Sequence, residues 1–321
     1  MQKQVGANPR QSAASSTWRW LRITCMVGGI GFIVWLLWRL LRDPDFLNHH
    51  LVVSGFVGAV ALGVFANAMV GMIFSDLVAK SVHIDFDKRI SAYYFSQIAK
   101  YVPGRIAALL VQKSILSGPR ALSATIISNL ELMAICSALC TGAALALLVA
   151  SRSLAGAAVI AAVSIGVGVL LIRINWAPLL RCAQRVIPRY RFSSELHPTQ
   201  RIGRTRAAIL STSVLVLPAT SNYVLLTDGI NIPHGMAIPL TALLLLSWVG
   251  GMIAFVFPAG IGIRELIFFL LGGALWHAPG AELMAGIAVS ARLTQVLTDI
   301  VGVLLFLAVR RLWRFANGQR K

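Results

Sequence analysis

Five ionisable residues lie inside long apolar stretches of the sequence: Glu131, Arg264, Glu265, Arg292 and Asp299. A charged side chain at the centre of a bilayer costs roughly 2.5–3.5 kcal/mol, so five of them would cost about 12 kcal/mol or more. That sum is comparable to the stability of a whole domain. We therefore expect these side chains to face one another, water or a polar ligand.

The segment from Pro258 to Glu265 combines two of these charges with a break in the chain. The proline ends one helix, Gly260 and Gly262 loosen the backbone, and a new helix is expected to start beside them. The free N–H groups and positive dipole end of that helix would favour an anion. Arg264 adds a bidentate partner for phosphate, and Glu265 could restrain Arg264 or a neighbouring cation. The alternative is a simple loop with a structural ion pair.

A second break lies between Lys100 and Arg105, which flank Pro103 and Gly104. Proline removes an N–H donor and clashes with the preceding turn, and glycine permits the dihedral angles that a break requires. Broken backbone at membrane depth is tolerated only where protein buries it or a water-filled cavity surrounds it. The alternative is a proline kink at the headgroup level, with both cations extended to the interface.

The last apolar stretch carries a polar stripe. Arg292, Gln295 and Asp299 are spaced at i, i+3 and i+7, so they share one face of a helix. Such a stripe lines a polar cavity or forms a buried relay, or it serves only to bind helices together. A weaker stripe on 121–150 includes Ser128 and Glu131, which also share a face.

Catalytic and metal-binding patterns are missing from the sequence. The six histidines lie in loops or near the ends of apolar stretches without metal-ligand spacing, and no nucleophile has an adjacent base. Cys136 and Cys140 are one helical turn apart with no accompanying metal motif, so we expect free, packed thiols. The sequence therefore predicts no enzyme activity, no catalytic residue, no metal and no cofactor.

Composition identifies the class of protein. Of 321 residues, 57% are hydrophobic and 12% charged, and the mean hydropathy is +0.77. Soluble domains carry about 25% charged residues, and barrel strands would alternate over about ten residues. These values exclude a soluble enzyme, a DNA-binding domain and an outer-membrane barrel. They predict an all-α polytopic membrane protein.

The apolar stretches predict eight spans within one transmembrane domain, residues 23–309. The spans are 23–41, 51–74, 121–150, 154–172, 207–226, 236–257, 261–278 and 283–309, with 90–111 entering and returning as a re-entrant segment. Whether 90–111 and 258–278 cross or re-enter is left open by the pattern. Residues 1–22 are expected to be a disordered cytoplasmic tail, and 310–321 a basic cytoplasmic tail.

The net charge of +18 lies mainly in tails and loops, which is typical of cytoplasmic segments beside anionic lipid rather than of a nucleic-acid surface. The loop 173–206 holds eight arginines and one acid. Both termini are therefore expected inside. Each half of the chain also pairs a Pro/Gly break with a following arginine and a polar span, which indicates a possible inverted repeat of the kind that surrounds transport sites.

The two break motifs, Lys100-Tyr101-Val102-Pro103-Gly104 and Pro258-Ala259-Gly260-Ile261-Gly262-Ile263-Arg264-Glu265, resemble those of the transmembrane region of lysylphosphatidylglycerol synthases, the flippase-like domain family. The resemblance covers nearly the whole chain after the N-terminal tail. Ala259 stands where the family usually has a second glycine. Because the sequence ends at Lys321, we expect no synthase domain, and hence neither lipid aminoacylation nor tRNA use.

The resemblance implies that the chain moves a lipid across the bacterial inner membrane. Stand-alone members of the family are implied to handle phospholipids, hopanoids or polyprenyl-linked intermediates. In this hypothesis Lys100, Arg105 and Arg264 neutralise phosphate, while Glu131, Glu265 and Asp299 balance Arg292 or bind a cationic headgroup. The alternative is a non-catalytic membrane partner of a lipid-modifying enzyme or glycosyltransferase, without nucleic acid in either case. The sequence predicts neither the lipid, the direction and energy source of transport, nor the oligomeric state.

Overall fold

The computed structural model describes residues 52–101, 106–118, 121–150, 152–174, 202–254, 260, 262–275 and 281–318, and in these ranges it is all helical without strands. The elements are α3 (Val53–Ser81), α4 (Phe86–Ala99), α5 (Ile106–Leu116), α6 (Ala121–Ala150), α7 (Leu154–Arg173), α9 (Arg204–Val224), the π-helical η1 (Leu225–Gly229), α10 (His234–Ile253), α11 (Ile263–Leu275) and α12 (Ala281–Gly318). The predicted all-α class is confirmed for this part of the chain.

Six helices of the described ranges are long and apolar enough to cross a membrane: Val53–Ser81, Ala121–Ala150, Leu154–Arg173, Arg204–Gly229, His234–Ile253 and Leu283–Trp313. They correspond to six of the eight expected spans and support a polytopic membrane protein. The predicted span 23–41 lies outside the described residues, as do the tail 1–22 and most of the loop 173–206.

Of the remaining expected span, 261–278, the structure describes residues 262–275, which hold the short helix α11. Its 13 residues extend about 20 Å at 1.5 Å per residue, against about 30 Å for the hydrocarbon core. Helix α11 packs along α10. A Cβ atom at Gly251 would contact the Arg264 side chain, and one at Gly272 would reach Leu243, so the two helices are antiparallel. We call this pair hairpin 2.

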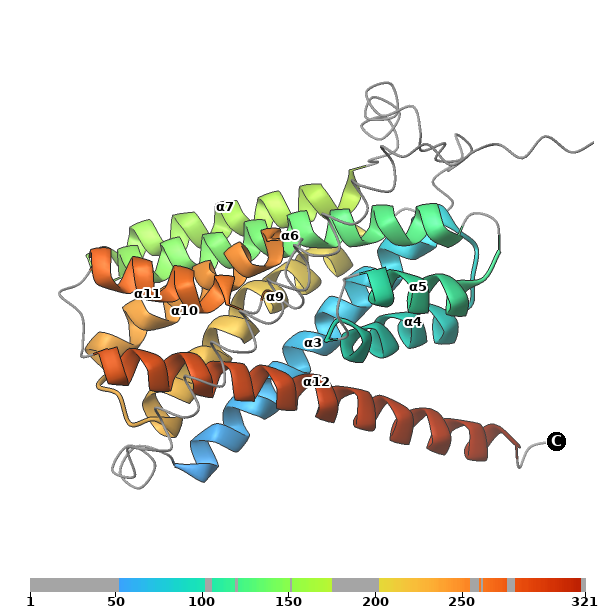
Figure 1. Ribbon diagram of the computed structural model, residues 1–321. Helices are drawn as coiled ribbons and strands as arrows, with labels where there is room; N and C mark the ends of the chain where they lie inside the picture. Colours follow the sequence, from blue (N-terminus) through green and yellow to red (C-terminus); the bar gives the residue numbers. More distant parts are fainter. Residues whose placement is uncertain are drawn as a thin grey trace, which may run out of the picture.

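The helices α4 and α5 form a second antiparallel pair, hairpin 1. The side chain of Gln112 on α5 donates to Ser96 Oγ on α4 at 2.9 Å. Farther along the pair, Ile90 and Leu116 are buried in one apolar cluster. Figure 1 shows hairpin 1 at one end of the bundle and α10 with α11 at the other, while α12 passes both.

Polar contacts define the two ends of the bundle. At the first, which we call the arginine end, α3 finishes beside the start of α9, and Arg206 forms a two-pronged ion pair with Asp76 at 2.8–2.9 Å. Arg310 of α12 pairs with Asp87 of α4 at 2.7 Å, so hairpin 1 starts there as well. At the opposite end the N–H of Val52 donates to the carbonyl of Gly229, where α3 begins and η1 ends.

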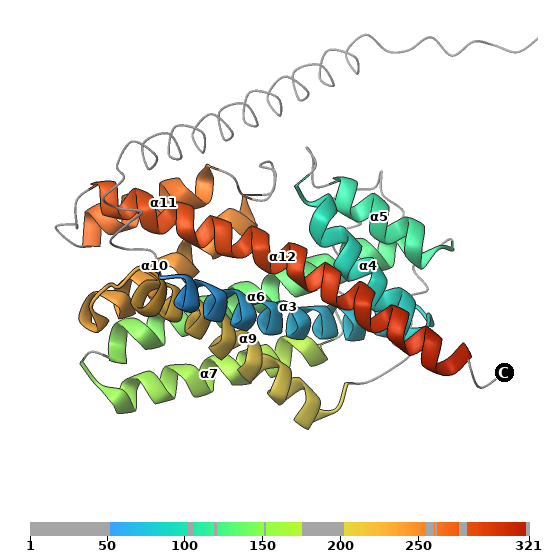
Figure 2. The ribbon, with the colours of Figure 1, turned by 90° about the horizontal axis from the view of Figure 1, so that it is seen from below.

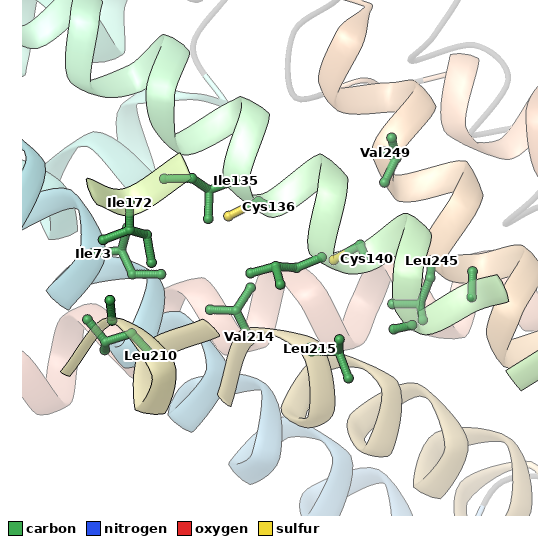
Figure 3. Close-up of a cluster of buried hydrophobic side chains, with 14 of the residues drawn as sticks. Ile73, Ile135, Cys136, Cys140, Ile172, Leu210, Val214, Leu215, Leu245 and Val249 are labelled. Atoms are coloured by element: carbon green, nitrogen blue, oxygen red, sulfur yellow. The ribbon is translucent and has the colours of Figure 1, made fainter. Parts of the chain in front are cut away.

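The largest apolar core surrounds α6. It joins α3, α7, α9 and α10 through buried residues such as Ile73, Ile135 and Val214 (Figure 3). Cys136 and Cys140 lie in this core as free, buried thiols, as the sequence predicted. Figures 1 and 2 both place α7 on the side of the bundle away from α12. Its outer face exposes large aliphatic side chains, which is typical of a helix that contacts lipid: Leu154, Val159, Val163 and Leu170.

Candidate functional site

The polar stripe of α12 is the centre of the candidate site. Arg292, Gln295 and Asp299 share one face of α12, as predicted, and each of them contacts a residue near the tip of one of the hairpins. Asp299 also contacts Asn67, the central residue of α3, which is 14 residues from either end of that helix. At 1.5 Å per residue this is about 21 Å from each end. The site therefore lies at mid-depth in the bundle.

Hairpin 1 reaches the stripe through Asp299. Lys100 Nζ lies 2.8 Å from Asp299 Oδ2, and the Tyr101 hydroxyl donates to the same oxygen at 2.6 Å. The second carboxylate oxygen accepts from Asn67 Nδ2 at 3.3 Å, and Asn67 in turn accepts from the Tyr93 hydroxyl. Charged hydrogen bonds of this kind are stronger than neutral ones. Asp299 thus joins α3, α12 and the tip of hairpin 1.

The local sequence explains why the tip is here. Helix α4 ends at Ala99, immediately before the predicted proline break, so Lys100 and Tyr101 stand at its deep end. Tyr93 is seated over Gly71 of α3, where a Cβ atom would lie 2.8 Å from its ring. A residue without a side chain is therefore needed at position 71 for α4 to approach α3.

Hairpin 2 reaches the stripe through Arg264 and Glu265. Glu265 Oε1 lies 2.8 Å from Arg292 Nε, forming a buried ion pair. Arg264 Nη1 donates to Gln295 Oε1, and Arg292 Nη1 donates to the same oxygen at 3.3 Å. Glu265 therefore pairs with Arg292 of α12. Of the two partners that the sequence allowed for Glu265, Arg264 or a neighbouring cation, the geometry matches the second.

Two glycines shape the backbone just before α11. Gly260 and Gly262 have positive φ angles of 68° and 85°, which residues with side chains rarely adopt. A Cβ atom at Gly260 would also lie 2.7 Å from the carbonyl oxygen of Gly251. The Gly262 N–H donates to Glu265 Oε2 at 2.8 Å, which is the glutamate half of a capping box. This end of α11 is thus partly satisfied by its own carboxylate, a difference from the free anion site that the sequence predicted.

The two contacts together form one charged cluster, which we define as Lys100, Arg264, Glu265, Arg292, Gln295 and Asp299. Gln295, which contacts hairpin 2, and Asp299, which contacts hairpin 1, are one turn apart on α12, so the two hairpin tips are neighbours. Arg264, Glu265 and Asp299 are 8%, 3% and 4% exposed, whereas the Lys100 side chain retains 23% exposure. Three cations and two carboxylates give the cluster a formal charge of +1.

Arg264 supplies the excess charge. The neutral amide of Gln295 accepts from it, and within the ranges described above no carboxylate oxygen lies within 4.0 Å of its guanidinium group. A buried cation whose partner is neutral is costly, and a guanidinium group is well suited to bind a carboxylate or phosphate in a bidentate manner. The cluster can therefore accept one further negative charge.

Glu131 lies apart from this cluster. Its carboxylate is 3.8 Å from Lys80 Nζ of α3, and Lys80 also donates to the carbonyl oxygens of Ile172 and Ile174, at the C-terminal end of α7. A cation at the C-terminus of a helix is favoured by the helix dipole. Among the described residues, Glu131 thus contributes to an ion pair near the arginine end, and the structure does not bring it together with the charged cluster.

Four of the predicted site residues fall outside the described ranges: Pro103, Gly104, Arg105 and Pro258. Conversely, sequence reasoning missed Asn67, Tyr93, Tyr101 and Lys80. Asn67 carried a signal, since it and Ser54 are the two polar residues of the apolar stretch 51–74. Tyr101 carried one in its place within the first break motif, whereas Tyr93 carried none, because a tyrosine near a membrane surface is common without a specific role.

Chemically, the cluster can bind and release charged groups. No group of three or more possible metal ligands occurs in the described ranges. Comparison with models of known protein families found no match to this chain, and comparison with curated proteins found no similar sequence. The resemblance drawn from the two motifs stays a prediction.

Proposed function

We propose that this protein moves a lipid across the bacterial inner membrane, with the charged cluster receiving the polar headgroup while the acyl chains stay in the bilayer. The observation that carries the proposal is the cluster itself. Charges from two interrupted helix pairs and a membrane-length helix meet at mid-depth, where each would be costly without a polar partner. Intramembrane charges of this kind are typical of substrate pathways.

The order of elements supports the same proposal. In the first half α3 leads into hairpin 1 and then into α6; in the second, α9 leads into hairpin 2 and then into α12. Hairpin 1 starts at the arginine end and hairpin 2 at the opposite end, with α7 connecting the halves. We interpret this as an inverted repeat with two re-entrant hairpins, and interrupted helices at the interface of such repeats hold the substrate in several transporter folds.

The distribution of cations supports an orientation. Within the described ranges, the arginine end carries Lys80, Lys88, Arg89, Arg173, Arg204, Arg206, Arg310 and Arg311, whereas the loop at 152–153 of the opposite end contributes Arg152. Loops rich in lysine and arginine stay in the cytoplasm. In our proposal the arginine end is cytoplasmic, and so are both termini. In the same proposal the chain is a relative of the lysylphosphatidylglycerol synthase transmembrane region.

Translocation of a fluorescent phosphatidylglycerol in proteoliposomes tests the proposal. We expect the wild type to expose the lipid to an external quencher and Arg264→Gln to do so at least tenfold more slowly. Arg310→Ala is the matched control, since it removes an arginine outside the cluster. Folded protein in each preparation is measured by size-exclusion chromatography. Equal rates for the wild type and Arg264→Gln would contradict the proposal and favour a membrane partner of a lipid-modifying enzyme.

A further inference from the structure

The two arginines of the cluster converge on a single oxygen atom. Arg264 and Arg292 come from different helices, and one Nη1 of each donates to Gln295 Oε1. Two like charges are thereby brought together in a buried place around a neutral acceptor. An amide oxygen has two lone pairs, which suffices for these two donors, but it carries no charge that offsets their repulsion.

Both carboxylates of the cluster are already bound to other groups. Glu265 divides its two oxygens between Arg292 Nε and the Gly262 N–H, and Asp299 is occupied by Lys100, Tyr101 and Asn67. Among the described residues, the excess charge of +1 therefore remains on Arg264, whose guanidinium group meets that of Arg292 at Gln295. A ligand that carries one negative charge and several acceptor oxygens matches this place in both charge and hydrogen bonding.

We infer that Arg264 and Arg292 form a binding site for a singly charged oxyanion of the phosphodiester type, and that Gln295 Oε1 occupies the position that an oxygen of this anion takes on binding. Gln295 is then the residue that keeps the two arginines in place between binding events. The inference deepens the proposed function, on which the choice of a lipid headgroup as the source of the anion rests. It separates the roles of the two hairpins: hairpin 2 supplies the anion site, and the Lys100–Asp299 contact anchors hairpin 1.

The test compares three substitutions at two glutamines in the purified full-length chain. Gln295→Glu places a permanent carboxylate between the arginines, and we expect it to weaken binding of dioleoylphosphatidylglycerol at least tenfold. Gln295→Met keeps the length of the side chain but removes the competing acceptor, and we expect tighter binding. Gln97→Glu is the matched control. Gln97 accepts from Lys100 at 2.8 Å, so this variant adds the same negative charge next to Lys100 in hairpin 1, away from the two arginines. We expect its effect to be less than threefold.

Affinities are measured by native mass spectrometry in detergent, with dimethyl phosphate as the headgroup alone and dioleoylglycerol as the lipid without phosphate. We expect the phospholipid to bind at least tenfold more tightly than either. Tight binding of dimethyl phosphate that Gln295→Glu abolishes would support the oxyanion site and overturn the lipid as its source. Equal affinity of Gln295→Glu and the wild type for the phospholipid would overturn the site.

Folding of Gln295→Glu is checked by its thermal unfolding. Because the new carboxylate pairs with two buried cations, we expect a midpoint at least as high as that of the wild type. If the variant is unstable, Arg264→Gln is used in its place, with the same tenfold loss expected and the same conclusion drawn from its absence. The result is separable from the proposed function. Anion binding that depends on Gln295, without lipid movement by the wild type, would keep the site and remove translocation.

Discussion

The two hairpins meet the same helix with opposite arrangements of charge. In hairpin 1 the cation is on the hairpin and the carboxylate on α12, as Lys100 and Asp299 show. In hairpin 2 the carboxylate is on the hairpin and the cation on α12, as Glu265 and Arg292 show. A hairpin docked at the wrong level of α12 would therefore bring like charges together, and the charge pattern of α12 selects the level at which each tip binds.

The hairpins also differ in how completely water is excluded. The pair in hairpin 2 is almost fully buried, and its glutamate also caps α11. The pair in hairpin 1 includes a lysine that reaches the surface in part, supported by neutral donors from Tyr101 and Asn67. An unpaired charge is most costly where water is absent. Neutralising the carboxylate should therefore lower the free energy of unfolding more in hairpin 2 than in hairpin 1.

The largest effect is expected for Glu265→Gln. It leaves Arg292 buried without this carboxylate and weakens the cap of α11, so we expect a loss of about 3–5 kcal/mol in the free energy of unfolding, measured in detergent micelles. The double substitution with Arg292→Gln should recover most of this loss, because the cation that lost its carboxylate is then removed as well. A double variant as unstable as Glu265→Gln would show that the pair is not the origin of the effect.

A smaller loss is expected for Asp299→Asn, about 2–3 kcal/mol by the same measurement, because the partly exposed Lys100 can recover hydration. The asparagine keeps an acceptor for the Tyr101 hydroxyl. Lys100→Met in the same chain should restore stability. If Asp299→Asn costs more than Glu265→Gln, the proposed difference in burial between the hairpins does not determine their stability.

The close packing of hairpin 1 on α3 is tested by Gly71→Ala. The new methyl group would meet the Tyr93 ring, which must move and disturb its bond to Asn67, so we expect a loss of about 1–2 kcal/mol. Gly166→Ala in α7 is the matched control, since a Cβ atom there meets nothing within 4 Å and alanine favours the helix by about 0.5–1 kcal/mol. The midpoints of thermal unfolding measure both effects. A shift of the two midpoints in the same direction would contradict this interpretation.

The smallest effect is expected at the start of hairpin 1, where Arg310 pairs with the partly exposed Asp87. Arg310→Ala should cost about 0.2–1 kcal/mol, because water and salt screen this pair. The loss should shrink further as ionic strength rises, whereas the effect of Glu265→Gln should persist. Unfolding at low and high salt measures both. A salt-independent loss at Arg310 would mean that its stacking against Phe306, at 5.9 Å, outweighs the ion pair.

Much of the fold was predictable from local patterns. Hydropathy located six helices of membrane length, and the spacing of Arg292, Gln295 and Asp299 placed them correctly on one face, because helical periodicity is a property of a short segment. The ends of α4 at Ala99 and of α10 at Ile253, before the two predicted breaks, were predictable for the same reason. The level at which α11 turns back along α10 was not, since a short apolar helix fits either a crossing or a hairpin.

The candidate site was predictable in its residue types and less so in its pairs. Glu131 illustrates the limit. Its position in an apolar helix showed that it needed a partner, but the partner depends on how α6 is rotated and which residue of α3 faces it. That residue is Lys80, which the sequence analysis did not single out.

By itself, the sequence determined the class of the protein, the places where its helices break and the residues too polar for an apolar surrounding. The tertiary structure alone decided which cation meets which carboxylate, and that two arginines converge on one glutamine. The physical reason is distance along the chain. Hydropathy and periodicity act over a few turns, whereas Tyr101 and Asp299 are 198 residues apart and meet only because hairpin 1 packs against α12.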